Sequence, residues 1–412
     1  MRKKLRNVII VYDYAFVNGG AARVAIQSAI ALSNIDEINV TFFSAVGPVC
    51  DELQNSSVNC KCLNICDINS GNRIKAMKNG IWNSVAKQAF ESLLKEYDAN
   101  DTVIHFHGWS KALSSVVINR AIKANFRCII TLHDYFTVCP NGGLYNYRTG
   151  KICKIVPSSM KCYLCNCDKR SYPQKIWRDI RQIVQNRVVK NCSQLSYISI
   201  SDLNERVVKP FVQSANFYRV DNPTMVSANK HTSVGATILY VGRLSEEKGA
   251  ELFCQSICQL KHINEHCVDG VIIGAGTQYE ELYSKYQKCV KFVGWKNATE
   301  VQQYMESARA LVLPSKWYEG APLTIIEALM KGLPCIVSDC TSAVELIHDD
   351  VNGFVFKSGD VNSLAEKIEK ILDDNVYSRF VNNIKEQFKP ENYHMAMHID
   401  RLLEVYEDCL TK

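Results

Sequence analysis

Two carboxylates stand eight residues apart in the segment 315–328, SKWYEGAPLTIIEA, and their setting suggests chemistry. Pro322 is typical of a first helical turn, and Gly332 is typical of the position just past a helix end. Glu319 precedes this helix, and Glu327 falls on its apolar face, where a carboxylate needs a polar partner. Backbone N–H groups at the helix N-terminus attract anions. The segment therefore predicts a pocket whose carboxylates hold hydroxyls and whose amides hold phosphates, as a nucleotide sugar requires.

A basic loop, VGRLSEEKG at 241–249, follows another apolar run and is expected to reach the same sheet edge as Glu319. It carries Arg243 and Lys248. Sugar transfer from a nucleotide donor leaves a diphosphate, which fixed cations and helix N-termini stabilise without a metal ion. The chain contains no Asp-x-Asp motif for a divalent metal, which agrees with a metal-free site.

Each motif alone also has a purely structural interpretation. Glu327 could pair with a lysine or lie at the helix edge, and Glu246, Glu247 and Lys248 could form a salt-bridged turn. Because both motifs are expected at one edge, we favour the binding interpretation.

The bulk composition is that of a globular protein of two domains, since 412 residues exceed one ordinary core. Hydrophobic residues make up 47% and charged residues 22%, with a net charge of +6, which is too modest and diffuse to favour nucleic acid as a partner. No apolar run has the length of a membrane span, and the N-terminus lacks a signal-peptide pattern. With most of its 18 cysteines scattered singly, the chain is expected to be cytoplasmic.

Apolar strand-like runs alternate with helical patterns, which predicts an α/β fold with parallel sheets. The expected strands are 8–12, 40–44, 103–106, 128–132, 195–200, 237–241, 271–273, 291–293, 310–313 and 335–337. A break at Asn222 divides the chain into an N-terminal domain, 1–222, and a C-terminal domain, 223–392. The last segment, 393–412, reads as a helix expected to pack back on the first domain. Glycines and polar residues follow the strands in both halves, so both carboxyl edges are expected to line one interdomain cleft.

Three further groups lie at strand ends but carry weaker signals. Gly19 and Gly20 precede a helix start, where a simple turn is equally plausible. The segment 274–276, GAG, opens another helix but lacks the full dinucleotide-binding fingerprint. His107 and His133 are placed to reach a ligand, although buried histidines more often make structural hydrogen bonds.

The chain resembles the GT-B glycosyltransferases of family 4, the retaining "glycosyl transferases group 1". The matching pieces run in the family's order over essentially the whole chain: NGGAARVA, TLHDY, VGRLSEEKG, IIGAGTQYEEL, FVGW, LPSKWYEGAPLTIIEALMKGLPCIVSD and VNGFVF. The resemblance implies two Rossmann-like domains that face an interdomain cleft, with the acceptor bound by the N-terminal domain and the nucleotide-sugar donor by the C-terminal one.

The resemblance also implies roles for particular residues. Arg243 and Lys248 would bind the donor diphosphate, Glu319 the sugar hydroxyls, and Glu327 the ribose. The implied donor-binding set is Gly19, Gly20, Arg243, Lys248, Gly276, Glu319, Gly320, Ala321, Pro322, Leu323 and Glu327. The implied catalytic set is Glu319, Arg243, Lys248 and His133, the last approaching the sugar. Many relatives have an acid where this chain has Ala22.

The implied reaction moves a sugar, with retention, from a UDP- or GDP-sugar to a hydroxyl acceptor. No cofactor is required, and the leaving phosphate helps to deprotonate the acceptor. By analogy with the family, the acceptor is a saccharide, expected to be lipid-linked, in the synthesis of bacterial O-antigen, capsule or exopolysaccharide. The enzyme would then work in the cytoplasm, at the inner face of the plasma membrane. A GT-B nucleotide-sugar epimerase and a non-catalytic nucleotide-sugar-binding subunit are the alternatives.

A cysteine-rich excursion, 139–167, is expected within the N-terminal domain. Four of its cysteines suggest a structural zinc site by their spacing: Cys139, Cys153, Cys162 and Cys165. In a chain so rich in cysteine, unligated thiols are the alternative.

A basic, amphipathic segment follows at 173–192. Its cations are Lys175, Arg178, Arg181, Arg187 and Lys190. We expect an ordinary helix with a solvated basic face, and the alternative is a helix that lies on anionic membrane.

Overall fold

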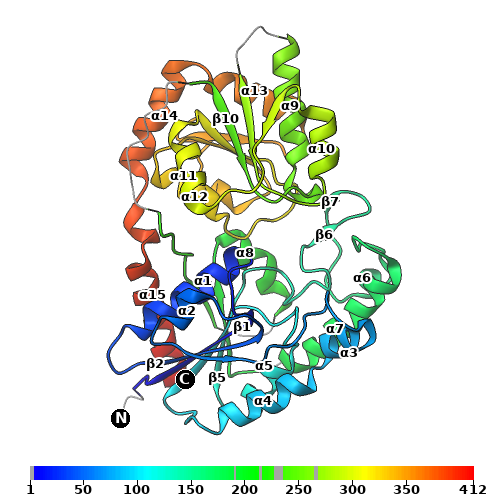
Figure 1. Cartoon of the computed structure of the whole chain (residues 1–412), viewed down its shortest axis with the longest axis vertical. Coiled ribbons are helices and arrows are strands. Elements are labelled where there is room, and N and C mark those ends of the chain that lie inside the picture. The colour runs from blue at the N-terminus through cyan, green and yellow to red at the C-terminus, as the bar shows by residue number, and fades with distance from the viewer. Residues whose placement is uncertain (1–3, 190–191, 213–215, 227–234, 264–267) are drawn as a thin grey trace. The chain divides into compact units, whose positions relative to one another are not determined.

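The computed structural model describes residues 4–189, 192–212, 216–226, 235–263 and 268–412. The chain divides into two compact units, each built around a parallel sheet (Figure 1). Unit 1 comprises Met1–Gly143, Lys154–Pro223 and His394–Lys412, and unit 2 comprises Leu144–Cys153 and Thr224–Tyr393.

Unit 1 contains a seven-stranded parallel sheet with the strand order β3-β2-β1-β4-β5-β8-β9. Its strands are β1 (Asn7–Tyr14), β2 (Asn39–Val46), β3 (Asn59–Cys62), β4 (Thr102–Phe106), β5 (Arg127–Thr131), β8 (Leu195–Ser199) and β9 (Phe217–Arg219). Its helices are α1 (Gly20–Ser33), α2 (Asp51–Gln54), α3 (Arg73–Ile81), α4 (Ser84–Leu94), α5 (Val116–Lys123), α6 (Met160–Leu164), α7 (Tyr172–Val189), α8 (Asp202–Val208), η1 (Lys209–Phe211) and α15 (Met395–Thr411). The central strands are buried on both faces, which explains their nearly continuous apolar sequences.

The C-terminal helix α15 is part of unit 1, where it packs against α1 and β4. Tyr406 is fully buried, and its hydroxyl lies 2.7 Å from Nδ1 of His105 in β4. His398 bonds Oγ of Ser28 at 3.0 Å and the carbonyl of Asp221 at 2.8 Å. These buried polar contacts fix the register of α15 as well as its position, because each would be costly to leave unmade.

Unit 2 contains a six-stranded parallel sheet with the strand order β12-β11-β10-β13-β14-β15. Its strands are β10 (Thr237–Val241), β11 (Asp269–Ile273), β12 (Val290–Phe292), β13 (Ala310–Leu313), β14 (Cys335–Ser338) and β15 (Gly353–Phe356). Its helices are η2 (Glu246–Lys248), α9 (Ala250–Ile263), α10 (Tyr279–Tyr286), α11 (Ala298–Ser307), α12 (Leu323–Met330), η3 (Ser342–Glu345), α13 (Val361–Ile371), α14 (Asp374–Gln387) and η4 (Pro390–Tyr393). Ile238 and Tyr240 join one buried core and Leu239 the other, as strand alternation requires.

The predicted α/β fold with two Rossmann-like parallel sheets is confirmed. The structure differs from the sequence expectation in the excursion 139–167, all of which we expected in the N-terminal domain. Its short hairpin, β6 (Tyr145–Asn146) and β7 (Lys151–Ile152), lies in the Leu144–Cys153 segment that belongs to unit 2. The Tyr145 hydroxyl lies 3.5 Å from Oε1 of Glu246, which accounts for this grouping.

Glycines let the loops of unit 2 pack backbone against backbone at the carboxyl ends of the strands. Leu244 donates its N–H to the carbonyl of Ala275 at 2.9 Å. A Cβ on Gly276 would lie 2.2 Å from the Leu244 carbonyl oxygen. The glycines of the predicted GAG segment therefore fix the approach of one loop to the next.

Gly249 provides a test of this packing. It has φ +71°, and a Cβ there would lie 2.0 Å from the Pro314 carbonyl oxygen. We expect Gly249→Ala to lower the free energy of unfolding by about 3 kcal/mol, through left-handed strain plus a backbone clash. The matched control is Gly294→Ala, with φ +73° and no atom within 4 Å of the added Cβ. In a denaturant titration, Gly294→Ala should lower the free energy of unfolding by about 1 kcal/mol, from the left-handed backbone strain alone. Equal losses in both variants would contradict the packing argument.

Candidate functional site

Glu319 is the buried acid around which the loops of unit 2 are organised. Its Oε1 accepts hydrogen bonds from Lys248 Nζ at 2.5 Å, Ser315 Oγ at 2.7 Å and Trp317 Nε1 at 2.9 Å. Burial raises the pKa of Glu319, but the Lys248 charge and these hydrogen bonds outweigh burial, and the net pKa is lowered. Glu319 is therefore a carboxylate at neutral pH, held in one orientation.

The two residues of this ion pair come from loops that are distant in sequence and adjacent in the sheet. Lys248 ends η2, in the loop after β10, and Glu319 lies in the loop after β13. These two strands pair in parallel, so their carboxyl ends place both loops side by side. Lys316 N–H also bonds the Glu247 carbonyl at 2.8 Å, which ties the loops together through the backbone.

Arg243 is held by a second buried carboxylate. Its Nη2 lies 3.0 Å from Oε1 of Glu247, which also accepts a bond from Ser245 Oγ at 2.9 Å. The Glu247 side chain is 2% exposed, whereas that of Arg243 is 61% exposed. Buried Glu247 thus holds the Arg243 guanidinium, which remains exposed to solvent and can bind an anion. Two residues of the salt-bridged turn that we considered as an alternative, Glu247 and Lys248, form ion pairs outside it, with Arg243 and Glu319 respectively.

The helix α12 ends as the sequence indicates, but it begins one residue later than expected. Gly332 has φ +75°, and the N–H groups of Gly332 and Leu333 bond the carbonyls of Leu329 and Ala328, both at 2.9 Å. Pro322 is the N-cap rather than the first helical residue. Glu327 lies in α12 and is half-buried.

The loop before α12 is open enough to receive a ligand. Four predicted binding residues, Gly320, Ala321, Pro322 and Leu323, are all half-buried. Together with Arg243, Lys248 and Glu319 they share one edge of the unit 2 sheet. An exposed guanidinium, an ammonium and a helix N-terminus at one edge can stabilise a phosphorylated ligand.

In unit 1, the predicted residues Gly19, Gly20 and His133 lie at the carboxyl ends of β1 and β5. Gly19 is the N-cap of α1. No atom lies within 4 Å of the position that a Cβ on Gly19 would take. Ala22, where many relatives have an acid, is fully buried in α1. An ionised side chain there would lose its hydration, so a hydrophobic residue suits this position.

His133 belongs to a chain of histidines. Its Nε2 lies 2.9 Å from Nδ1 of His107, and Nε2 of His105 lies 2.6 Å from Oγ1 of Thr131. Burial, the larger effect, and the nearby His398 together lower the pKa of His133 to about 3. His133 is therefore neutral at physiological pH and acts as a hydrogen-bonding group rather than as a cation.

Asp13 is a structural residue that sequence reasoning missed. Its carboxylate, buried at the end of β1, accepts the N–H groups of Lys111, Ala112 and Leu113 at 2.7, 2.9 and 2.8 Å. These bonds shape the loop after β4, which also carries His107. The sequence could have indicated this role, because Asp13 directly follows a continuous apolar run, and an acid at a buried strand end needs hydrogen-bond partners.

The predicted zinc ligands are not assembled as a group in the described residues, where no three or more His, Cys, Asp or Glu side chains are placed to hold a metal ion. Cys139 Sγ lies 3.1 Å from Oδ1 of Asn141. Cys153 belongs to unit 2, whereas Cys139, Cys162 and Cys165 belong to unit 1.

Zinc binding by these cysteines stays a prediction, and elemental analysis of tag-free protein tests it. About one zinc per chain, lost in a Cys162→Ser variant, is the result that a structural site requires. Protein without stoichiometric metal would dismiss it.

The expectation of a solvated basic face on α7 is wrong. Lys175 is fully buried and Arg181 is 6% exposed, while Ile176 and Ile180 are each 46% exposed. Lys175 Nζ bonds Asp179 at 2.5 Å and the Cys162 carbonyl at 3.0 Å. Lys175 and Arg181 point inward because a buried carboxylate and backbone carbonyls accept their hydrogen bonds, which periodicity alone does not reveal, whereas Arg187 is exposed. Lys190 lies outside the described residues.

Residues 223–387 match the family model "Glycosyl transferases group 1", so this part of the chain is a domain of that family. The UDP-Gal:alpha-D-GlcNAc-diphosphoundecaprenol alpha-1,3-galactosyltransferase of Escherichia coli is 29% identical over 180 residues, 41% of this chain and 45% of the relative. The amylovoran biosynthesis glycosyltransferase AmsK of Erwinia amylovora is 33% identical over 138 residues, which are 31% of this chain and 34% of the relative. The chain thus spans less than half the length of these two curated relatives.

Solved structures match over nearly the whole chain. Anabaena HepE in complex with UDP-glucose has a TM-score of 0.67 at 16% identity and covers 98% of this chain and 99% of its own. TarM of S. aureus, in a complex with UDP, has a TM-score of 0.67 at 12% identity and covers 98% and 100%. These similarities establish the GT-B fold.

The charge on Glu319 leads to a prediction about stability and pH. We expect Glu319→Gln to lower the free energy of unfolding at pH 7 by about 2 kcal/mol, because a buried charge-assisted network is lost. Since the folded-state pKa of Glu319 is lowered, this stabilisation is present above the ordinary value of 4.5 and is lost as the pH falls through the folded-state pKa. Urea titrations between pH 7 and pH 3 should show the two proteins converging in acid. A constant difference would contradict the assignment.

Proposed function

We propose that this protein is a glycosyltransferase that moves a sugar from a UDP- or GDP-sugar to a hydroxyl acceptor with retention of configuration. The observation that carries the proposal is the Lys248–Glu319 pair at the N-terminus of α12, beside the exposed guanidinium of Arg243. A donor diphosphate needs fixed positive charge, and a donor sugar needs a fixed carboxylate. The family match over 223–387 and the UDP and UDP-glucose complexes of HepE and TarM support this proposal.

The geometry suggests a role for each group. Arg243 and Lys248 would meet the diphosphate and stabilise the charge that grows on it as the sugar departs. The Glu319 carboxylate, already held in place by Ser315 and Trp317, would orient the sugar hydroxyls. Glu327, on the next helical turn of α12, would hold the ribose. Because these groups are held before the ligand arrives, little reorganisation is needed in the transition state.

We further propose that the acceptor is a saccharide, lipid-linked, in the synthesis of a bacterial surface polysaccharide. Two of the relatives support this choice by their names, an undecaprenol-linked galactosyltransferase and an amylovoran glycosyltransferase. Within the described residues, no helix is both long and apolar enough to cross a membrane. Peripheral contact with the inner face of the plasma membrane is therefore the form of association that we propose.

Ligand-induced stabilisation tests the donor site. We expect one class of UDP-, GDP-, ADP- or dTDP-sugar to raise the melting temperature with EDTA present, because about 100-fold excess over Kd adds about 2.7 kcal/mol to the native state. The shift should vanish in Lys248→Ala and in Glu327→Ala. The matched control is Lys285→Ala, which removes an ion-paired lysine from the surface of α10. Loss of the shift in the control, or none with any nucleotide sugar, would contradict the donor site.

Turnover tests the catalytic assignment separately from binding. We expect Lys248→Ala to lower kcat for sugar transfer by about 100-fold, since it removes a charge that stabilises the leaving diphosphate. Lys285→Ala should retain normal turnover. Near-normal transfer by Lys248→Ala would exclude the role, and conversion of the donor without an acceptor would favour an epimerase.

A further inference from the structure

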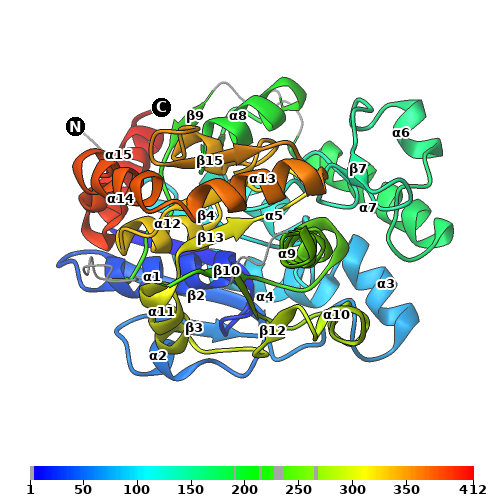
Figure 2. The ribbon, with the colours of Figure 1, turned by 90° about the horizontal axis from the view of Figure 1, so that it is seen from above.

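A pocket of about 660 Å³ lies in unit 1, and its lining includes Lys111 from the loop after β4 that Asp13 holds. It is formed by the helices α3 and α7, which lie side by side (Figures 1 and 2), and by the loops that precede them. Its size is that of a small-molecule site. No role follows for it from the motifs of the sequence.

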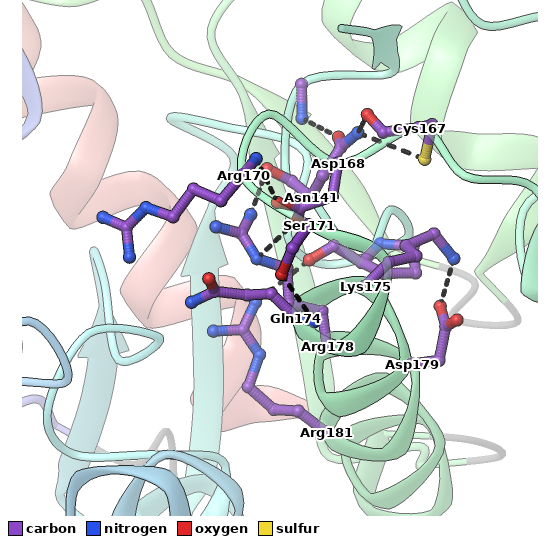
Figure 3. Close-up of polar contacts among 12 residues, drawn as sticks. Asn141, Cys167, Asp168, Arg170, Ser171, Gln174, Lys175, Arg178, Asp179 and Arg181 are labelled. Atoms are coloured by element: carbon purple, nitrogen blue, oxygen red, sulfur yellow. Dashed lines mark hydrogen bonds and ion pairs between the residues drawn. The ribbon is translucent and has the colours of Figure 1, made fainter. Parts of the chain in front are cut away.

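The pocket is lined by positive charge. The described residues that line it include four cations, Arg73, Lys111, Arg170 and Arg178, and no carboxylate. Figure 3 shows the side chains of Arg170, Gln174 and Arg178 on one side of α7 and the Lys175–Asp179 pair on another. Positions 174 and 178 are one helical turn apart, which gives the pocket a continuous polar wall.

The nearby acids are already engaged, one of them with a cation of the pocket lining. Asp168 lies 3.0 Å from Nε of Arg178 and accepts the N–H of Arg170 at 2.9 Å. Asp13 accepts its three backbone N–H groups. Asp67 bonds the Tyr14 hydroxyl at 2.8 Å and Ser70 Oγ at 2.7 Å. None of the ion pairs in the described part of the chain includes Arg73 or Lys111.

Lys111 is a partly buried cation close to other positive charges. Its ammonium lies over the Phe136 ring, 4.8 Å from the ring centre. Burial, the largest effect, and the charges of Arg181 and Arg178 lower the pKa of Lys111 to about 8, although Asp134 and Asp13 act in the opposite direction. An anion in the pocket would relieve this repulsion.

Two further features suit a phosphate ester, the first by attracting an anion and the second by contacting the organic group that a simple anion lacks. Ser171, Pro173 and Gln174 line the pocket at the N-terminus of α7, a helix of 18 residues whose dipole favours phosphate. Apolar groups, Met77 and Trp177, complete the lining. Cations beside apolar walls suit a phosphate attached to an organic group.

We propose that this pocket binds the phosphate or diphosphate group of a phosphorylated acceptor. The assignment of the ligand as an acceptor rests on the proposed function, because it places a second substrate in unit 1. The shared chemistry is a phosphate ester, which a lipid phosphate and a soluble sugar phosphate both provide.

Calorimetric titration with pyrophosphate, geranyl diphosphate and geraniol tests the proposal. Each of the three ligands is titrated into protein that carries Lys248→Ala, which removes one cation of the basic loop of unit 2 and so weakens competing binding at the proposed donor site. We expect Arg73→Gln/Lys111→Gln to weaken pyrophosphate binding about tenfold, because two charge-assisted contacts are lost. The matched control is Lys75→Gln/Lys78→Gln. It removes two exposed lysines of α3, the helix that carries Arg73, and neither lysine lines the pocket. It should change affinity less than about twofold.

Tighter binding of geranyl diphosphate than of pyrophosphate would identify a lipid phosphate as the ligand, and equal affinity a soluble phosphorylated saccharide. Absence of pyrophosphate binding, equal losses in the two double variants, or geraniol bound as tightly as its diphosphate would overturn the proposal. If the double variant does not fold, Arg73→Gln alone, at an exposed position, replaces it.

Stabilisation by a nucleotide sugar, measured on the same variants with Lys248 intact, keeps the two proposals separate. It should survive Arg73→Gln/Lys111→Gln, since neither residue belongs to the predicted donor-binding set. No stabilisation of the wild type would count against the donor site, whatever the pyrophosphate result.

Discussion

The burial of the Glu319 carboxylate is the constraint on which the carboxyl edge of unit 2 depends. A buried charge is tolerated only when it is paired and hydrogen-bonded. Here the partners come from two loops, Lys248 after β10 and Ser315 and Trp317 near Glu319 itself. Of the three bonds, only the one from Lys248 joins the two loops, and the bond from the Lys316 N–H to the Glu247 carbonyl adds a second link. The edge is therefore preorganised for a ligand before the ligand binds.

Glycines at the same edge allow the loops around Glu319 to pack closely. Gly249 and Gly276 approach the carbonyls of Pro314 and Leu244 more closely than any residue with a Cβ allows. The backbone contacts bring η2 and the loop before α12 within reach of each other. Close packing of the loops and satisfaction of the buried acid are thus two parts of one arrangement.

Unit 1 shows how buried charge overrides periodicity. The helix α7 buries Lys175, Asp179 and Arg181 and exposes Ile176 and Ile180. Judged by residue type, its polar face should meet water. Arg181 instead donates to the carbonyls of Ser110 and Pro140, at 3.0 and 3.1 Å. These carbonyls belong to loops far away in sequence, so no local pattern could have revealed where the basic face would lie.

The central strands were predictable, because parallel strands buried on both faces form continuous apolar runs; β10 and β13 were predicted to the residue. The short strands β3 and β9 were not, since their few residues lack such a run, and the apolar strand β15 was missed. The Gly332 helix end was also predictable, because glycine there follows from backbone sterics.

By itself, the sequence determined the two-sheet α/β architecture, the order of its strands along the chain and the strand ends that carry Arg243, Lys248 and Glu319. These follow from local rules of hydrophobic pattern, glycine and helix capping. Only the tertiary structure decided that Lys248 pairs with Glu319, that the histidines form a chain, and that the cations near α7 line a pocket. The physical reason is that the partner of a buried charge is set by three-dimensional neighbours, and Lys248 and Glu319 are 71 residues apart along the chain.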